Sequence, residues 1–442
     1  MLPGDLDLPN GFKMTELGPL PEEWEVVRLG DIANLKIGRT PARKEKRFWS
    51  DGIIPWVSIS DLNNSLVTQT RERISEFAFK EVFRGNYVPA GSLLLSFKLT
   101  IGKVGILGMP AVHNEAIASV FPEESKIFKE FLFYLFQNLD FTGSLDAYVK
   151  GKTLNKKKLL TLPIPLPPLP EQRAIAYVLR TVQRAKEATE RVIAALTELK
   201  KSLMKHLFTY GPVPLDQADQ VALQDTPIGP IPAHWRLIKL GEVAEKPQYG
   251  YTSSAVHDPV GPKFLRITDI QNDRVQWASV LYCVIENDLL LHKYRLRRGD
   301  ILFARIGATT GKTYLISECP QAVFASYLIR IRTNASQLLP EYLYFFTHTP
   351  QYWQQINAAK GGRLKQGINI PILTTLNVSL PPLDEQREIA RILQTVNHKI
   401  EAEENRKQAL DDLFKTLLHN LMTAKIRVPR TMVERFADHE PG

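Results

Sequence analysis

The chain contains the stretch LPPLPEQRAIAYVLRTVQRAKEATERVIAALTELKKSLMKHLF at residues 166–208, and it repeats this stretch later with changes. The second copy, LPPLDEQREIARILQTVNHKIEAEENRKQALDDLFKTLLHNLM, covers residues 380–422, at an offset of 380 − 166 = 214. Both copies open with Pro-Pro and place Glu in the turn that follows, as helix N-termini often do. Neither copy then has Pro or Gly before Gly211 and Pro429. Each therefore predicts one helix of roughly 37 residues, about 55 Å long.

Apolar residues recur every seven positions in both copies, which is typical of helices that pair in a coiled coil. The predicted seam consists of Ile175, Leu179, Val182, Leu196 and Leu203 in the first copy, and Ile389, Leu393, Val396, Leu410 and Leu417 in the second. The copies are not identical at the seam, since Lys200 corresponds to Phe414. This pattern favours two helices that pair with each other. The alternative is that each helix packs only on its own domain.

A second pair of repeated segments marks the start of each half. Residues 15–24, TELGPLPEEW, match residues 226–235, TPIGPIPAHW, at an offset of 235 − 24 = 211. At the same offset, LGDI at 29–32 matches LGEV at 240–243. The chain is therefore predicted to be a duplication. Its parts are a domain at 15–165, a spacer helix at 166–211, a second domain at 226–379 and a second spacer helix at 380–425.

Each half has short β-branched and aromatic runs between Gly and Pro residues, a pattern that predicts many short strands. The predicted strands lie at 53–60, 92–97, 104–107 and 116–121 in the first half, and at 264–268, 300–306, 313–316 and 323–331 in the second. Aromatic helical segments follow, EFLFY at 130–134 and EYLYF at 341–345, and we expect their rings in the core. The predicted fold class is α+β, with a mixed or mostly antiparallel sheet in each half.

Composition favours an acidic partner. The 442 residues carry a net charge of +9 with a pI of about 9.3, and such a surplus of base is most often directed at nucleic acid. The two cysteines, Cys283 and Cys319, provide neither a disulfide framework nor zinc-finger spacing. The sequence has no signal-peptide pattern and no long apolar run, so we expect a cytoplasmic protein without a membrane span.

The string GATTGKT at 307–313 is the one segment that looks catalytic. A phosphate-binding P-loop needs four residues between its first Gly and its Gly-Lys, but only three separate Gly307 from Gly311. We interpret it, and LTIGKV at 99–104, as tight turns that present Lys312 and Lys103. The sequence contains no HExxH, GxSxG or GxGxxG motif, and its nine His residues have no metal-ligand spacing. We therefore predict no catalytic, cofactor or metal site, and expect His113 to be structural or solvent-facing.

Basic residues gather at matching places in the two halves, which favours a shared surface that follows a phosphate backbone. The candidate DNA-binding residues are Arg39, Arg43, Lys44, Lys98, Lys103, Lys152, Asn155 and Lys156 in the first half, and Arg305, Lys312, Lys360, Arg363, Lys365 and Gln366 in the second. Arg and Lys can read guanine in the major groove, and Asn155 or Gln366 could read adenine. The alternative for any one cluster is a solvated face.

The two LPPLxEQR helix starts, the LGDI and LGEV segments after a Trp, and the two Gly-Lys turns together resemble the specificity subunits of type I restriction–modification enzymes. The resemblance extends from about Thr15 to the end of the second long helix. It implies a target recognition domain in each half that reads one part of a split, asymmetric DNA site. It also implies that the long helices pair antiparallel and act as a spacer.

The resemblance further implies partners that carry the chemistry. Two modification (methyltransferase) subunits would dock on the long helices and bring S-adenosylmethionine, and restriction subunits would add cleavage driven by ATP and Mg. The chain itself would be a non-catalytic reader of double-stranded DNA. Two alternatives stay open: a P-loop NTPase, which the GATTGKT spacing disfavours, and a coiled-coil scaffold that does not bind DNA.

Overall fold

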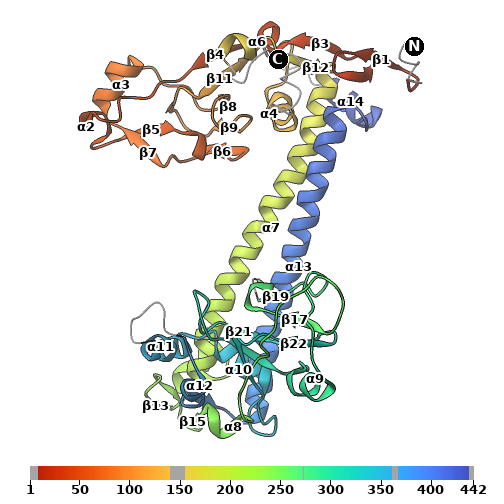
Figure 1. Ribbon diagram of the computed structural model, residues 1–442. Coiled ribbons are helices and arrows are strands. Elements are labelled where there is room, and N and C mark those ends of the chain that lie inside the picture. The colour runs from red at the N-terminus through yellow and green to blue at the C-terminus, as the bar shows by residue number, and fades with distance from the viewer. Residues whose placement is uncertain (1–7, 140–154, 272, 361–366, 438–442) are drawn as a thin grey trace. The chain divides into compact units, whose positions relative to one another are not determined.

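A computed structural model describes residues 8–139, 155–271, 273–360 and 367–437 of the chain. The chain folds into two compact units, one made of residues 1–190 with 406–442 and the other of residues 191–405. Each unit contains one α+β domain and a segment of both long helices, α7 (Leu169–Tyr210) and α13 (Leu383–Met422) (Figure 1). The predicted α+β class with an internal repeat is confirmed. The predicted domain limits stay a prediction.

The first unit is built on a five-stranded mixed sheet. Its strand order is β4 (Ala33–Ile37), β11 (Ile117–Pro122), β8 (Leu93–Ser96), β9 (Val104–Leu107) and β6 (Ser65–Val67). Only the β6–β9 pair is parallel among these neighbours. A smaller sheet has the order β10 (Val112–His113), β5 (Ile54–Val57) and β7 (Glu72–Ile74), and it lies beside α2 (Lys46–Trp49) and α3 (Glu76–Phe83).

The strand predicted at 53–60 is shorter, because β5 ends at Val57 and a 3-10 turn, η1 (Ile59–Asp61), follows. The Asp61 carboxylate accepts a hydrogen bond from the Ser58 backbone N–H at 2.8 Å, which closes this turn and stops the strand.

The second unit repeats this plan with one strand fewer in its main sheet. The order is β16 (Gln248–Tyr249), β23 (Leu328–Ile331), β20 (Ile301–Ala304) and β21 (Thr313–Leu315). The parallel pair β17 (Lys263–Leu265) and β22 (Ala322–Phe324) corresponds to β5 and β10. After η3 (Ile267–Asp269), where the first unit has β6, the second has a hairpin of β18 (Ile270–Gln271) and β19 (Arg274–Val275).

The single strand predicted at 323–331 is wrong, because the segment forms two strands, β22 and β23. The first pairs in parallel with β17 and the second pairs antiparallel with β20, so the chain crosses between two sheets. A turn closed by the Leu328 N–H and the Ala325 carbonyl, at 2.9 Å, makes the crossing. The apolar run is continuous because both strands are buried.

Short elements complete each unit in matching order. The hairpins are β1 (Phe12–Thr15) with β2 (Gly18–Pro21), and β13 (Leu223–Gln224) with β14 (Ile231–Pro232). The two-stranded pairs are β3 (Glu25–Arg28) with β12 (Pro163–Leu166), and β15 (Arg236–Lys239) with β24 (Asn377–Leu380). The short helices are α1 (Leu29–Ile32), α6 (Lys156–Leu160), η2 (Leu215–Gln220), α8 (Leu240–Val243), α9 (Asp288–Tyr294), α11 (Pro350–Ala359), α12 (Ile370–Thr374) and α14 (Arg430–Ala437).

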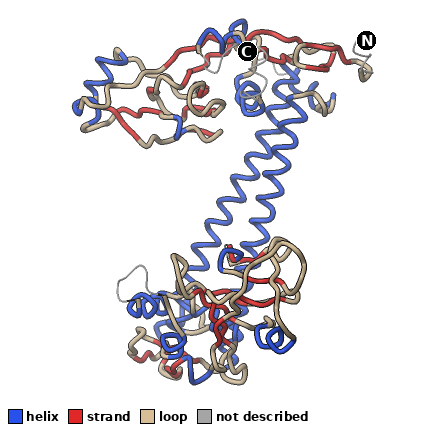
Figure 2. The backbone as a smooth tube through the Cα atoms, viewed as in Figure 1, coloured by secondary structure: helices blue, strands red, loops and turns tan. Residues whose placement is uncertain are grey.

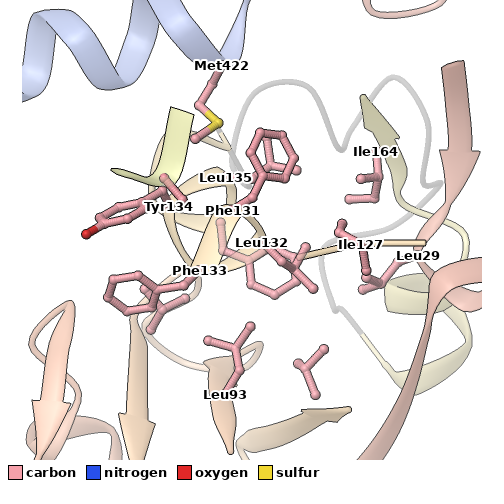
Figure 3. Packing of buried hydrophobic residues seen from close by; sticks show 14 of the residues in the cluster. Leu29, Leu93, Ile127, Phe131, Leu132, Phe133, Tyr134, Leu135, Ile164 and Met422 are labelled. Carbon is pink, nitrogen blue, oxygen red and sulfur yellow. The ribbon is translucent and has the colours of Figure 1, made fainter. Parts of the chain in front are cut away.

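The predicted aromatic segments are helices α4 (Lys129–Asn138) and α10 (Pro340–Phe346), and their rings are buried as expected. Figure 3 shows Phe131 and Leu135 of α4 packed among side chains from other elements, including Leu93 of β8 and Ile164 of β12. Met422 of α13 reaches the same cluster. The core of the first unit therefore ties the sheet to the long helices.

Within each unit the two long helices lie side by side (Figure 2), and their contacts show that they run antiparallel. In the first unit Lys186 pairs with Asp411 at 2.9 Å and Glu190 pairs with Lys407 at 3.0 Å, so α7 numbers rise as α13 numbers fall. In the second unit Leu207, near the end of α7, shares a core with Ile389, near the start of α13. The helices have 42 and 40 residues, longer than expected.

The predicted seam residues differ in burial. The buried ones are Ile175, Leu179, Ile389 and Leu393, and the half-buried ones are Val182, Leu196, Leu203, Val396, Leu410 and Leu417. The buried four belong to the domain cores, and the half-buried Leu203 and Leu417 pack against these cores as well. Among the described residues, no helix combines the length and the apolarity needed to cross a bilayer.

Candidate nucleic-acid interface

A buried Gln in each LPPLxEQR motif fixes the domain to the long helix. Gln172 accepts a hydrogen bond from the Phe128 N–H at 2.7 Å and donates to the carbonyls of Pro167 and Lys126. Gln386 accepts from the Leu339 N–H at 2.8 Å and likewise donates to two carbonyls, those of Pro381 and Gln337. Both side chains are fully buried. We call this arrangement the Gln clamp, and it explains why the motif recurs: it joins the start of the long helix to the start of the aromatic helix.

The Glu before each clamp residue binds the Trp that opens each half. The Trp24 indole N–H donates to Glu171 at 2.9 Å, and the Trp235 indole N–H donates to Glu385 at the same distance. The repeated Trp and the repeated Glu are thus one contact made twice. Beside it, the first unit adds Arg427, which donates to Glu171 at 2.8 Å, whereas in the second unit His234 approaches Glu385 at 2.7 Å.

The Leu-Gly pair of each half allows two short helices to pack closely. A side chain on Gly30 would come within 3.2 Å of Leu160 in α6, and one on Gly241 within 2.9 Å of Thr374 in α12. The LPPLxEQR motifs and the Trp and Leu-Gly segments therefore build a frame. The surface that could bind DNA must be sought where the frame holds exposed loops.

The two Gly-Lys segments are hairpin turns, as the sequence analysis interpreted them. One joins β8 to β9 and the other joins β20 to β21. In the second, the Gly311 N–H donates to the Ala304 carbonyl at 2.8 Å, and Lys312 leads directly into β21. A P-loop instead wraps phosphate at the N-terminus of a helix. The GATTGKT segment has no such helix, so its backbone is not a nucleotide cradle.

Predicted residues of the second half surround its hairpin turn. The Arg305 guanidinium stacks 4.7 Å from the Tyr249 ring, and Lys312 is exposed. Lys360 donates from its ammonium group to the Thr310 carbonyl at 2.7 Å, and burial lowers the pKa of this lysine. These three cations lie together at one end of the sheet. Arg363, Lys365 and Gln366 lie outside the described residues.

Predicted residues of the first half lie in separate places. Lys98 and Lys103 flank the β8–β9 turn, whereas Arg39, Arg43 and Lys44 are exposed on the segment between β4 and α2. Arg43 forms an ion pair with Glu72, whose hydrogen bond raises the pKa of the arginine. Its guanidinium also stacks 3.9 Å from the Trp49 ring. These contacts hold Arg43 within the smaller sheet region.

Asn155 has a structural partner. Its side-chain oxygen accepts a hydrogen bond from the Lys158 N–H at 3.0 Å and so caps α6, as Asn369 caps α12 through the Ile372 N–H. Lys156 is exposed in the first turn of α6, and Lys152 lies outside the described residues. A DNA contact by any of these residues stays a prediction.

Exposed apolar side chains near both hairpin turns were missed from the sequence. Leu99 lies in the β8–β9 turn, Ile306 lies in the β20–β21 turn, and Tyr327 lies beside the latter. Tyr327 is placed there by its carbonyl, which accepts a hydrogen bond from the Arg305 N–H at 3.1 Å. The sequence offered only their closeness to the Gly-Lys segments, because apolar residues are ordinarily assigned to the core.

Comparison with known proteins agrees with this geometry. The family model described as "Type I restriction modification DNA specificity domain" matches residues 21–198 and residues 232–412, one match in each half. The chain therefore belongs to the type I restriction–modification DNA specificity family, and the resemblance drawn from the motifs is confirmed.

Among curated relatives, the type I restriction enzyme MjaVIII specificity subunit of Methanocaldococcus jannaschii is 26% identical, over 92% of this chain and 94% of the relative. The EcoKI specificity subunit of Escherichia coli K12 is 23% identical, over 85% of this chain and 82% of the relative. Among solved structures, the type I S subunit from M. genitalium has a TM-score of 0.58 at 14% identity, covering 94% of this chain and 98% of that one. The structural likeness concerns the fold.

Proposed function

We propose that this chain is the non-catalytic DNA-reading subunit of a type I restriction–modification complex, and that each half reads one part of a bipartite, asymmetric double-stranded site. The observation that carries the proposal is a shared frame with unlike tips. Both halves have the Gln clamp and the Trp–Glu contact, but their Gly-Lys hairpin turns carry different exposed residues. Two domains that share a framework but differ in the exposed residues of their hairpin turns are suited to binding two different DNA sequences.

The chemistry of the tips suits DNA. The hairpin turns of the two main sheets gather five cations: Lys98, Lys103, Arg305, Lys312 and, through its bond to Thr310 in the second turn, Lys360. The major groove of B-DNA is the wider of the two grooves, and arginine and lysine bind guanine there. Lysines beside the groove contact phosphates and fix the register without reading sequence. We therefore assign phosphate contacts to the Gly-Lys lysines.

We further propose that the long helices are the spacer between the two readers and the docking surface for two modification subunits. They expose apolar side chains, Val192 and Leu199 on α7 and Leu413 on α13, which suit a protein partner. The modification subunits would bind S-adenosylmethionine, and restriction subunits would bind ATP and Mg. Because the GATTGKT segment forms a hairpin turn and not a P-loop, we assign nucleotide binding to those subunits.

A salt titration of DNA binding tests the proposal. The chain is assembled with its modification subunits, methylated adenines are mapped by sequencing, and the affinity for the mapped site is measured between low and high salt. Lys103→Ala and Lys312→Ala should each reduce the slope of log K against log salt by about 1, as expected for one lost phosphate contact.

The control is Lys239→Ala, since Lys239 is an exposed lysine of β15, outside the hairpin turns and the long helices, and it should leave the slope unchanged. Binding that does not depend on salt, or the absence of any methylated site, would favour the scaffold that does not bind DNA.

A further inference from the structure

The tip of the β8–β9 hairpin presents a leucine to solvent. Leu99 is 92% exposed, more than the other large hydrophobic residues of the described chain. Its backbone is also unusual, with φ of 62°, a left-handed conformation that side chains with a Cβ rarely adopt. Neither feature benefits the fold, because the side chain gains no burial and the backbone is strained. Such an outlier is reason to ask what the side chain does.

The tip is held rigidly. The Ser96 hydroxyl donates to the Thr100 carbonyl at 2.6 Å and accepts from the Lys103 N–H at 2.9 Å, and the Gly102 N–H donates to the Ser96 carbonyl. Phe97 is buried before the tip, and Ile101 packs partly against the core after it. Leu99 is therefore projected by a closed loop whose base is anchored on both sides.

The second half shows that the backbone conformation does not require leucine. Gly307 is the third residue after β20, as Leu99 is the third after β8, and Gly307 also has a left-handed backbone with φ of 81°. Nothing lies within 4 Å of where its Cβ would be. Glycine adopts this conformation without strain. The third position after the strand thus has a left-handed backbone in both turns, and it is occupied by glycine in one half and by a strained leucine in the other.

We propose that Leu99 is a specificity-determining residue of the first half, which places its side chain in the major groove against the 5-methyl group of a thymine. This inference rests on the proposed function, that the first half reads DNA. An exposed hairpin turn fits the wide major groove better than the narrow minor groove, and the thymine methyl is the apolar feature found in the major groove. Lys98 and Lys103 flank Leu99 and supply the charges that draw phosphates to the tip.

The experiment uses the chain assembled with its modification subunits and a duplex carrying the mapped site. Deoxyuridine, which lacks the methyl group, replaces thymine on both strands of one half-site at a time. For the wild type, replacement in the half-site that the first domain reads should weaken binding about fourfold, which corresponds to the loss of one buried methyl group. The effect of replacement in the other half-site should be the same for the wild type and for variants of Leu99.

Leu99→Ala and Leu99→Gly should weaken binding to the thymine duplex about tenfold and should abolish the response to deoxyuridine. Leu99→Gly should also keep or raise the unfolding temperature, because glycine relieves the left-handed strain. The control is Leu289→Ala, since Leu289 in α9 is also a highly exposed leucine, at 83%, and it should leave both responses as in the wild type.

Two results would overturn the inference and leave the proposed function intact: a wild type with salt-dependent binding but no response to deoxyuridine in either half, or Leu99 variants that respond as the wild type does. A wild type that binds no site at all would instead reject the proposed function.

Discussion

At one equivalent position the first unit buries His113 beside Ser119, whereas the second buries Phe324 beside Arg330. The His113 ring nitrogen Nε2 lies 2.5 Å from the Ser119 hydroxyl, and burial lowers the pKa of the imidazole to about 4, so the pair is neutral. The Arg330 guanidinium stacks 5.1 Å from the Phe324 ring and donates to the carbonyls of Arg295 and Lys293.

The two halves thus fill equivalent buried positions with different side chains, although they share the same framework contacts. The Gln clamp and the Trp–Glu contact are repeated in both halves and the Leu-Gly packing recurs with a different partner, yet the buried position compared here is neutral in one half and charged in the other. The framework contacts require the same backbone path in both halves, and they do not require the same side chains at these buried positions. Side chains inside the domain and at its hairpin tip therefore differ between the halves, which suits the proposed reading of two different sequences.

The largest effect is expected from substitutions that remove the Gln clamp shared by the two halves. Gln172→Ala and Gln386→Ala should each lower the free energy of unfolding by about 4 kcal/mol, since three buried or partly buried backbone groups lose their hydrogen bonds. Chemical denaturation of the full chain measures this loss. The control is Gln183→Ala, because Gln183 makes one bond to Glu187 on the side of α7, and it should cost under about 0.5 kcal/mol. A large loss in one half only would show that the clamp is not equivalent in the two.

A pH titration sharpens the comparison of the two interiors. His113 stays neutral in the folded chain until about pH 4, whereas the unfolded histidine takes up its proton near pH 6.5. The unfolded state therefore gains protons first, and stability should fall by about 3 kcal/mol as the pH drops from 6.5 to 4. His113→Gln should remove this part of the acid sensitivity. An unchanged pH profile of unfolding in the variant would contradict the neutral buried pair.

The smallest expected effect concerns the two helix caps. Asn155→Ala and Asn369→Ala should each cost about 1 kcal/mol of stability, as lost N-caps do. Measuring the DNA affinity of both variants separates the cap from base reading. Equal affinities would leave Asn155 as a cap alone, whereas a loss confined to Asn155→Ala would support the predicted adenine contact.

Much of the fold was predictable because the repeated motifs mark the elements that both halves share. The long helices, the aromatic core helices and the hairpin turns at Lys103 and Lys312 all follow from local patterns. The split of 323–331 into β22 and β23 does not, because strand partners distant in sequence decide it. Likewise, the composition of the chain cannot tell an exposed Leu99 from a buried leucine, since exposure depends on how the hairpin is closed by Ser96.

The candidate site was predictable only in part. Basic residues near the Gly-Lys segments pointed to the hairpin tips, but the sequence did not reveal that Arg43 pairs with Glu72 or that Lys360 bonds the Thr310 carbonyl. Both contacts join segments far apart in the chain. Charge patterning therefore proposed a surface, which stays a prediction, and the structure distinguishes which of its cations already have protein partners.

The central claim is that each half reads one part of the site within a constant frame, and a domain exchange tests it most directly. Residues 33–122, from β4 to β11, are replaced by the corresponding segment of the MjaVIII specificity subunit, which leaves both Gln clamps in place. The exchanged chain is assembled with its modification subunits, and methylated adenines are mapped by sequencing. We predict a site in which one half changes and the other half is retained. A site changed in both halves, or in neither, would contradict the account.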